Sequence, residues 1–166
     1  CNHVSYVDAM LLAGACRRPI RFVMDEWIFK NPALGWLFRL AKTIPICAKV
    51  KNEQTFENAF KQIKAELDDG NVVCIFPEGK LTRSGDINPF KKGVERILEE
   101  TPVPVVPMAI QGLWGSFFSH QGSGIFKSGK RFWSKVKIVA SEPVAAESAN
   151  AEMLQNKVQQ LRGEHA

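Results

Sequence analysis

The chain has 166 residues, the length of one domain, and its 45% hydrophobic and 10% aromatic content is enough to bury a packed core. Its net charge of +5 and isoelectric point of about 9.1 suit an anionic membrane surface, a phosphate-bearing ligand or nucleic acid, and do not choose among them. Every apolar run is shorter than the ~18 residues of a membrane span, so the chain can lie on a bilayer but should not cross it.

The cysteines and histidines predict neither a disulfide nor a metal site. They are Cys1, Cys16, Cys47, Cys74, His3, His120 and His165. The cysteines form no C-x-x-C pair, and Cys74 falls in a predicted buried strand, which favours reduced thiols in a cytosolic compartment. The histidines lack the spacing of metal ligands, so we predict that the protein binds no metal.

The first eight residues place an imidazole and a carboxylate five positions apart. Their sequence is Cys1-Asn2-His3-Val4-Ser5-Tyr6-Val7-Asp8, and it predicts an extended segment that turns into a helix with Ser5 as the N-cap. The Asp8 carboxylate should then meet one ring nitrogen of His3, fix the tautomer, and leave the other nitrogen free to accept a proton. A plain capping box beside a surface histidine is the alternative, and these eight residues taken alone favour it. Because the chain opens inside this motif, we expect it to be a piece of a longer polypeptide, truncated at its N-terminus.

The next segments alternate between helix and strand. Residues 9–13 continue the helix, and a strand is predicted at residues 20–24. Asp25 could cap a short helix that runs to Phe29. Residues 33–42 predict a largely apolar helix that we expect to be a buried core helix, with docking on lipid as the alternative.

A second alternation follows and indicates the fold class. A short strand at residues 44–47 precedes an amphipathic helix at residues 55–68, whose apolar residues recur every three or four positions and which Gly70 ends. Another strand begins at Val72. The resulting β-α-β order predicts an α/β fold with a mostly parallel or mixed sheet and helices on its faces.

An unbroken apolar run ends in a carboxylate and a glycine. Its sequence is Val72-Val73-Cys74-Ile75-Phe76-Pro77-Glu78-Gly79, which is typical of a strand buried on both faces. Glu78 should therefore lie at the carboxyl end of a buried strand, where open α/β sheets bind their ligands. The alternative is a plain turn with a solvated carboxylate.

The remaining segments are predicted as secondary structure, with no catalytic residue assigned to them. They are a polar loop at 80–92, a helix at 93–100, a strand at 101–110, an aromatic loop at 111–130, a strand at 136–140 and a helix at 145–161. Residues 124–131 nearly match a phosphate-binding P-loop, but Arg131 replaces the Ser or Thr that would ligate magnesium. A nucleophile elbow, G-x-S-x-G, is absent from the sequence, which argues against an ordinary serine hydrolase.

Taken together, Asn2-His3 with Asp8 and Phe76-Pro77-Glu78-Gly79 resemble the glycerolipid acyltransferases, the H-x-x-x-x-D family that includes lysophosphatidic acid and lysophospholipid acyltransferases. Residues 79–85 and 103–110 look like the family's third and fourth blocks. The resemblance covers residues 1–140 and implies a three-layer fold of the glycerol-3-phosphate acyltransferase type, and the length of the chain predicts a single domain over residues 1–166. Two extra residues before Thr82-Arg83-Ser84 look most similar to the branch that reacylates lysophospholipids and is often fused to other modules.

The resemblance also implies roles for particular residues. His3 would be the general base, and Asp8 would orient it. The residues implied in binding the acceptor are Glu78, Gly79, Arg83 and Lys49. The family's second block normally ends in a phosphate-binding arginine, whereas this chain has Ala48-Lys49-Val50-Lys51, so Lys49 would act as a point charge without the bidentate fork.

The implied reaction transfers a fatty acyl group from a thioester, on coenzyme A or acyl carrier protein, to the hydroxyl of a lysophospholipid or acylglycerol phosphate. No cofactor is needed, and a positioned base typically contributes about 10²–10⁴-fold. Backbone N–H groups of residues 2–5 or 77–79 are the expected donors to the oxyanion. A catalytically silent lipid-binding chain, or a thioesterase or phospholipid hydrolase using His3 and Asp8, are the alternatives.

The expected partners follow from the same resemblance. They are the acyl thioester donor, the acceptor lipid, a membrane surface and possible fused domains, with no nucleic acid. We expect a peripheral location on the cytoplasmic side of a membrane.

Overall fold

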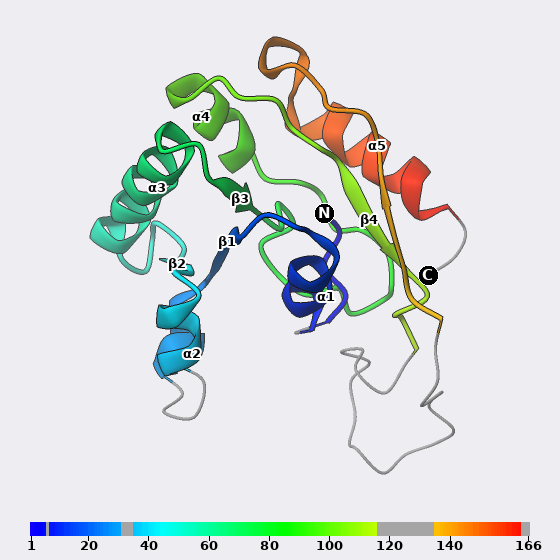
Figure 1. Ribbon diagram of the computed structural model, residues 1–166, viewed down its shortest axis with the longest axis horizontal. Coiled ribbons are helices and arrows are strands. Elements are labelled where there is room, and N and C mark those ends of the chain that lie inside the picture. The colour runs from blue at the N-terminus through cyan, green and yellow to red at the C-terminus, as the bar shows by residue number, and fades with distance from the viewer. Residues whose placement is uncertain (6, 31–34, 116–134, 164–166) are drawn as a thin grey trace.

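The computed structural model of the chain describes residues 1–5, 7–30, 35–115 and 135–163, and for residues 30 and 35–37 the backbone alone. Figure 1 shows how the elements are arranged. In chain order they are α1 (Asp8–Ala15), β1 (Ile20–Asp25), the 3-10 helix η1 (Glu26–Lys30), α2 (Gly35–Leu40), β2 (Ile44–Ile46), α3 (Glu53–Asp68), β3 (Val72–Cys74), α4 (Gly93–Glu100), β4 (Met108–Gln111), β5 (Lys137–Ala140), the 3-10 helix η2 (Ala146–Ser148) and α5 (Ala151–Arg162).

Three strands form a parallel sheet in the order β2-β1-β3. Helix α2 lies in the crossover from β1 to β2, and α3 in the crossover from β2 to β3, as parallel strands require. Neighbouring residues of β1 face opposite layers, because Phe22 packs in a cluster with α1 while Val23 packs in a cluster with α3. The predicted α/β fold, with a sheet between helical layers, is confirmed.

Helix α3 forms where the amphipathic pattern predicted it. The Asn52 side chain accepts a hydrogen bond of 3.0 Å from the Thr55 N–H and caps the helix at its N-terminus. Its buried face consists of Ala59, Phe60 and Ile63. Because Ala59 and Ile63 pack with residues of β1, β2 and β3, this helix covers one face of the parallel sheet.

A second, antiparallel pair of strands lies beside the parallel sheet. Met108 of β4 pairs with Ala140 of β5, and Gln111 with Lys137. Helix α5 runs alongside β4 (Figure 1). Leu154 of α5 packs in one cluster with Leu98 of α4, so α4 and α5 share a core of their own.

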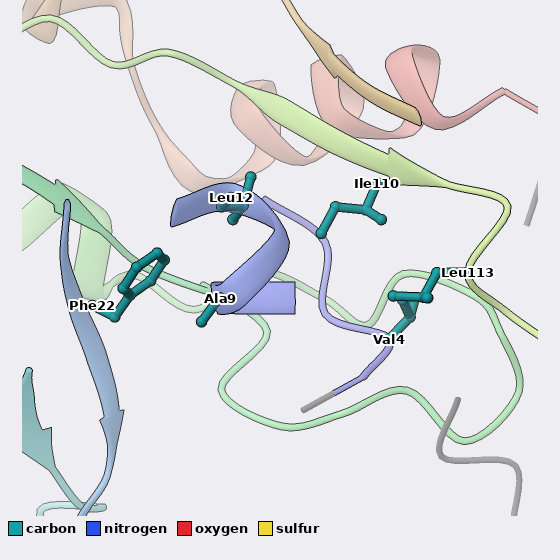
Figure 2. Close-up of a cluster of buried hydrophobic side chains, with 6 residues drawn as sticks. All are labelled: Val4, Ala9, Leu12, Phe22, Ile110 and Leu113. Carbon is teal, nitrogen blue, oxygen red and sulfur yellow. The ribbon is translucent and has the colours of Figure 1, made fainter. Parts of the chain in front are cut away.

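The core next to the first motif joins distant parts of the chain. Figure 2 shows Leu12 and Ala9 of α1 between Phe22 of β1 and Ile110 of β4. Leu12 is 1% exposed and Ile110 is 2% exposed. This packing fixes α1, and with it Asp8 in the first turn, relative to both sheets.

Several predicted boundaries are wrong for identifiable reasons. The strand predicted at residues 101–110 begins only at Met108, since three prolines precede it and proline cannot donate to a ladder. The N-cap of α1 is Val7 and not Ser5, because α1 starts at Asp8. The predicted cap at Asp25 is confirmed, because Asp25 Oδ1 accepts a hydrogen bond of 3.3 Å from the Trp27 N–H in the first turn of η1. The expected burial of the helix at residues 33–42 is wrong at Leu40, which is 74% exposed.

Some predictions concern residues that the structure does not describe. Most of the aromatic loop and the near match to a P-loop fall within residues 116–134, outside the described residues. Within the described residues, no helix is long and apolar enough to cross a membrane.

Candidate active site

The predicted contact between His3 and Asp8 is present. His3 lies in the extended segment before α1, and Asp8 is the first residue of that helix. The His3 Nδ1 and Asp8 Oδ2 atoms are 2.8 Å apart. A carboxylate accepts and does not donate, so Nδ1 carries the hydrogen and Nε2 is the basic nitrogen.

Asp8 is fully buried and fixed by the backbone of the turn before it. Its Oδ2 atom also accepts hydrogen bonds from the N–H groups of Val4, at 2.8 Å, and Ser5, at 3.0 Å. Its Oδ1 atom has no hydrogen-bond partner among the described residues. Since a buried carboxylate needs donors, this three-donor set stabilises the charged form and aims one oxygen at the imidazole.

The His3 ring is fixed on its face as well as at its edge. It stacks on Phe76, with ring centroids 4.2 Å apart and an interplanar angle of 19°. The side chain is 21% exposed, and Nε2 makes no hydrogen bond within the described part of the chain. An oriented imidazole with an accessible basic nitrogen is the arrangement of a general base.

Glu78 joins the second motif to the first. It is 1% exposed, and its Oε1 atom accepts a hydrogen bond of 2.7 Å from the His3 backbone N–H. Its Oε2 atom accepts two bonds of 2.8 Å from Asn88, one from the backbone N–H and one from the side-chain amide. Glu78 therefore brings the second motif into direct contact with His3, which Asp8 contacts from its own side.

Sequence reasoning missed Asn88 and gave the Asn2 side chain no role in this site. Asn88 binds Glu78, and the 1% exposed Asn2 bridges to β4, where its Oδ1 accepts from Ile110 N–H at 2.8 Å and its Nδ2 donates to Ile110 C=O at 3.1 Å. Asn2 thus pairs with the β4 backbone as a neighbouring strand would. The only sequence signal was that Asn2 immediately precedes His3.

The predicted acceptor-binding cations lie on the surface. Arg83 is exposed and makes no ion pair within the described residues. Lys49 is exposed and lies 3.1 Å from Glu53. No described contact joins Lys49 to His3 or Glu78, so its role stays a prediction.

A further cation, Lys91, lies against the turn that contains Gly79. Gly79 has a φ of +64°, and a Cβ atom at this position would lie 2.6 Å from Lys91 Nζ. The Lys91 side chain therefore passes directly over the Gly79 backbone, next to Glu78. Its own N–H donates to Pro77 C=O at 2.9 Å, which anchors the end of the polar loop to the turn.

The expected oxyanion donors are largely committed elsewhere. The N–H groups of His3, Val4 and Ser5 donate to Glu78 and Asp8, and Gly79 N–H donates to Phe76 C=O at 2.9 Å. These four groups stabilise the turns themselves. The expectation that these four groups stabilise the oxyanion is therefore wrong, and it stays a prediction for the N–H groups of Asn2 and Glu78.

The thiol of Cys74 and the acidic groups suggest no further chemistry. Burial raises the pKa of the Cys74 thiol above its ordinary value, which disfavours the nucleophilic thiolate. Within the described ranges, no three His, Cys, Asp or Glu side chains are grouped to hold a metal ion.

The two motifs lie within a region of the chain that matches a known protein family. The acyltransferase family model matches residues 1–111. The chain belongs to the acyltransferase family. It is 28% identical over 149 residues to the chloroplastic 1-acyl-sn-glycerol-3-phosphate acyltransferase BAT2 of Brassica napus, which covers 90% of this chain. It is 31% identical over 113 residues to a 1-acyl-sn-glycerol-3-phosphate acyltransferase of Cocos nucifera, which covers 68% of it.

A solved structure gives the same fold. The crystal structure of the 1-acyl-sn-glycerophosphate acyltransferase PlsC from Thermotoga maritima covers 96% of this acyltransferase-family chain with a TM-score of 0.68 and 23% identity. The alignments span 41% of the Brassica protein, 36% of the Cocos protein and 60% of the Thermotoga chain.

Proposed function

We propose that this acyltransferase-family chain carries the catalytic site for transferring a fatty acyl group from a thioester to a hydroxyl of a glycerol phosphate lipid. The observation that carries the proposal is the buried Asp8 carboxylate against His3 Nδ1, with Nε2 accessible above Phe76. The names of the relatives support a 1-acylglycerol 3-phosphate acceptor. A lysophospholipid acceptor rests on the sequence resemblance to the reacylating branch.

The reaction follows from the position of the free nitrogen. His3 Nε2 takes the hydroxyl proton while the oxygen attacks the thioester carbonyl, and Asp8 stabilises the imidazolium that forms. The tetrahedral intermediate then collapses, the carbon–sulfur bond breaks, and the imidazolium returns its proton to the leaving thiolate. The acyl carrier is coenzyme A or acyl carrier protein, both of which offer the same thioester.

The acceptor's phosphate needs a cation near this turn. Arg83 is exposed without an ionic partner among the described residues, and Lys91 lies over Gly79 beside Glu78. Both fit better than Lys49, which no described contact joins to His3 or Glu78 and which pairs with Glu53 on the surface at 3.1 Å. We therefore place the phosphate on the side of the polar loop at residues 80–92.

We infer that the protein has a peripheral location on a membrane surface. Its net charge of +5 and the exposed Leu40, at 74%, support a peripheral site on an anionic membrane surface. We infer the cytoplasmic side and fusion to further domains from the sequence resemblance alone.

The decisive experiment compares His3→Ala with His165→Ala, a control that removes a histidine outside both motifs. Each variant receives acyl-coenzyme A or acyl-carrier protein with a panel of lysolipids, and mass spectrometry identifies the acylated products. His3→Ala should abolish transfer while circular dichroism remains unchanged. Full transfer by His3→Ala would refute the assignment. Thiol release that does not depend on the acceptor would indicate a thioesterase, and vesicle binding without thiol release would indicate a silent lipid-binding chain.

A further inference from the structure

The Glu78 carboxylate faces the protein interior and not the surface on which an acceptor would bind. With 1% of the residue exposed, neither oxygen is accessible to a ligand in this conformation. Both oxygens already accept hydrogen bonds from His3 and Asn88. A carboxylate that bound glycerol hydroxyls would need at least one oxygen open to the cleft.

Residues of the second motif and its loop fix both polar groups of the His3 backbone. Glu78 accepts from the N–H at 2.7 Å, and Thr82 donates its N–H to the C=O at 2.9 Å. Phe76 stacks on the ring of the same residue. The catalytic imidazole is therefore positioned by a segment more than 70 residues away in the sequence, in addition to Asp8.

Asn88 fixes Glu78 in turn. Its two hydrogen bonds hold Oε2 in place, and this fixes the carboxylate in the orientation in which Oε1 reaches the His3 N–H. The loop that carries Asn88 is closed by the bond from Lys91 N–H to Pro77 C=O. The hydrogen bonds from Asn88 to Glu78 and from His3 to Glu78 thus connect the polar loop to the base.

We propose that Glu78 is a positioning residue, clamped by Asn88, that sets the place of His3 and does not bind the acceptor. This inference rests on the proposed function, in which His3 is the base. A displacement of the base of about 1 Å is enough to cost roughly 10²-fold in rate. The effect should therefore fall on kcat and not on the KM for the acceptor.

Glu78→Gln is the sharpest change, because glutamine has one acceptor oxygen and one amide donor. Whichever way the amide turns, its NH₂ group faces either the His3 N–H or the Asn88 donors, and one side of the clamp is lost. Asn88→Ala removes the side-chain donor and retains the backbone N–H. Glu99→Gln, on the exposed surface of α4, is the matched control.

The kinetic experiment separates positioning from binding. We expect Glu78→Gln to lower kcat by about 10- to 100-fold with the acceptor KM within about threefold of wild type. Asn88→Ala should give a smaller loss of the same kind, and the double variant should lose less than the product of the two. An acceptor KM raised tenfold with kcat unchanged would overturn the proposal and assign Glu78 to the acceptor.

A second readout does not depend on activity. Amide hydrogen exchange at His3 N–H, followed by nuclear magnetic resonance, should accelerate by at least about tenfold in Glu78→Gln or Asn88→Ala and stay unchanged in Glu99→Gln. Unchanged exchange in both clamp variants would refute the proposal even if the wild type transfers acyl groups. A wild type that transfers nothing but shows the accelerated exchange would refute the proposed function and keep the clamp. If Glu78→Gln does not fold, Asn88→Ala decides both readouts.

Discussion

Asp8→Asn tests the charge of the buried carboxylate without removing its shape. An asparagine oxygen can still accept from the ring Nδ1–H of His3 and from the backbone N–H groups of Val4 and Ser5. Its NH₂ group would occupy the place of Oδ1, which has no partner among the described residues. Asp8→Ala would instead leave three donors unpaired. The asparagine variant is therefore expected to fold, at a cost of about 1–3 kcal/mol for the weaker acceptor and the new unpaired donor.

The expected loss of rate follows from the distance. His3 Nδ1 and Asp8 Oδ2 are 2.8 Å apart, and both charges are spread over their groups, so the centres of charge lie about 4 Å apart. At an effective dielectric constant of about 20, this pair is worth about 4 kcal/mol when the imidazolium forms. Since about 1.4 kcal/mol corresponds to tenfold in rate, kcat should fall by about 10³-fold.

The assay is quantification of the acylated product by mass spectrometry at saturating thioester, with the acceptor varied. Asp69→Asn, at the exposed C-cap of α3, is the control for loss of one negative charge. The acceptor KM should change little, because Asp8 is buried behind His3. Retention of more than about a third of the wild-type kcat by a folded variant would contradict the role of the charge.

Two further predictions concern stability and reactivity. Gly79→Ala forces a residue with a side chain into a φ of +64° and against Lys91, so it should lower the free energy of unfolding by about 1–2 kcal/mol. Gly14→Ala, within α1 and without neighbours within 4 Å, should raise the free energy of unfolding by about 0.5–1 kcal/mol. Urea unfolding measures both values, and equal effects of the two substitutions would refute the argument. Burial raises the pKa of the Cys74 thiol in the folded state, so this thiol ionises at a lower pH in the unfolded chain than in the folded one. The free energy of unfolding should therefore decline as the pH rises above the usual thiol pKa of about 8.5. This decline should vanish in Cys74→Val, and Cys16 should be alkylated faster than Cys74 at pH 8, as mass spectrometry of the labelled peptides would report.

Local sequence patterns predicted the layers of the fold well. Helix α3 was predictable because its apolar residues recur at helical spacing and Gly70 follows it. The apolar run before Pro77 located β3, but the predicted burial on both faces is wrong, since β3 is half-buried at the edge of the sheet and ends at Cys74. These signals come from residues near one another in the chain. The start of β4 was predicted too early. The apolar pattern of residues 101–110 favoured a strand throughout, although its prolines cannot donate the hydrogen bonds of a β-ladder.

The sequence by itself determined the chemical groups of the site, because the spacing between His3 and Asp8 lets a single turn bring them into contact. The tertiary structure alone decided what surrounds them. Asn88 and Asn2 bind partners 10 and 108 residues away, and no local pattern encodes which buried donor meets which acceptor. The orientation of Glu78 was settled in the same way, because a buried carboxylate turns toward whichever donors packing supplies, and here these belong to His3 and Asn88.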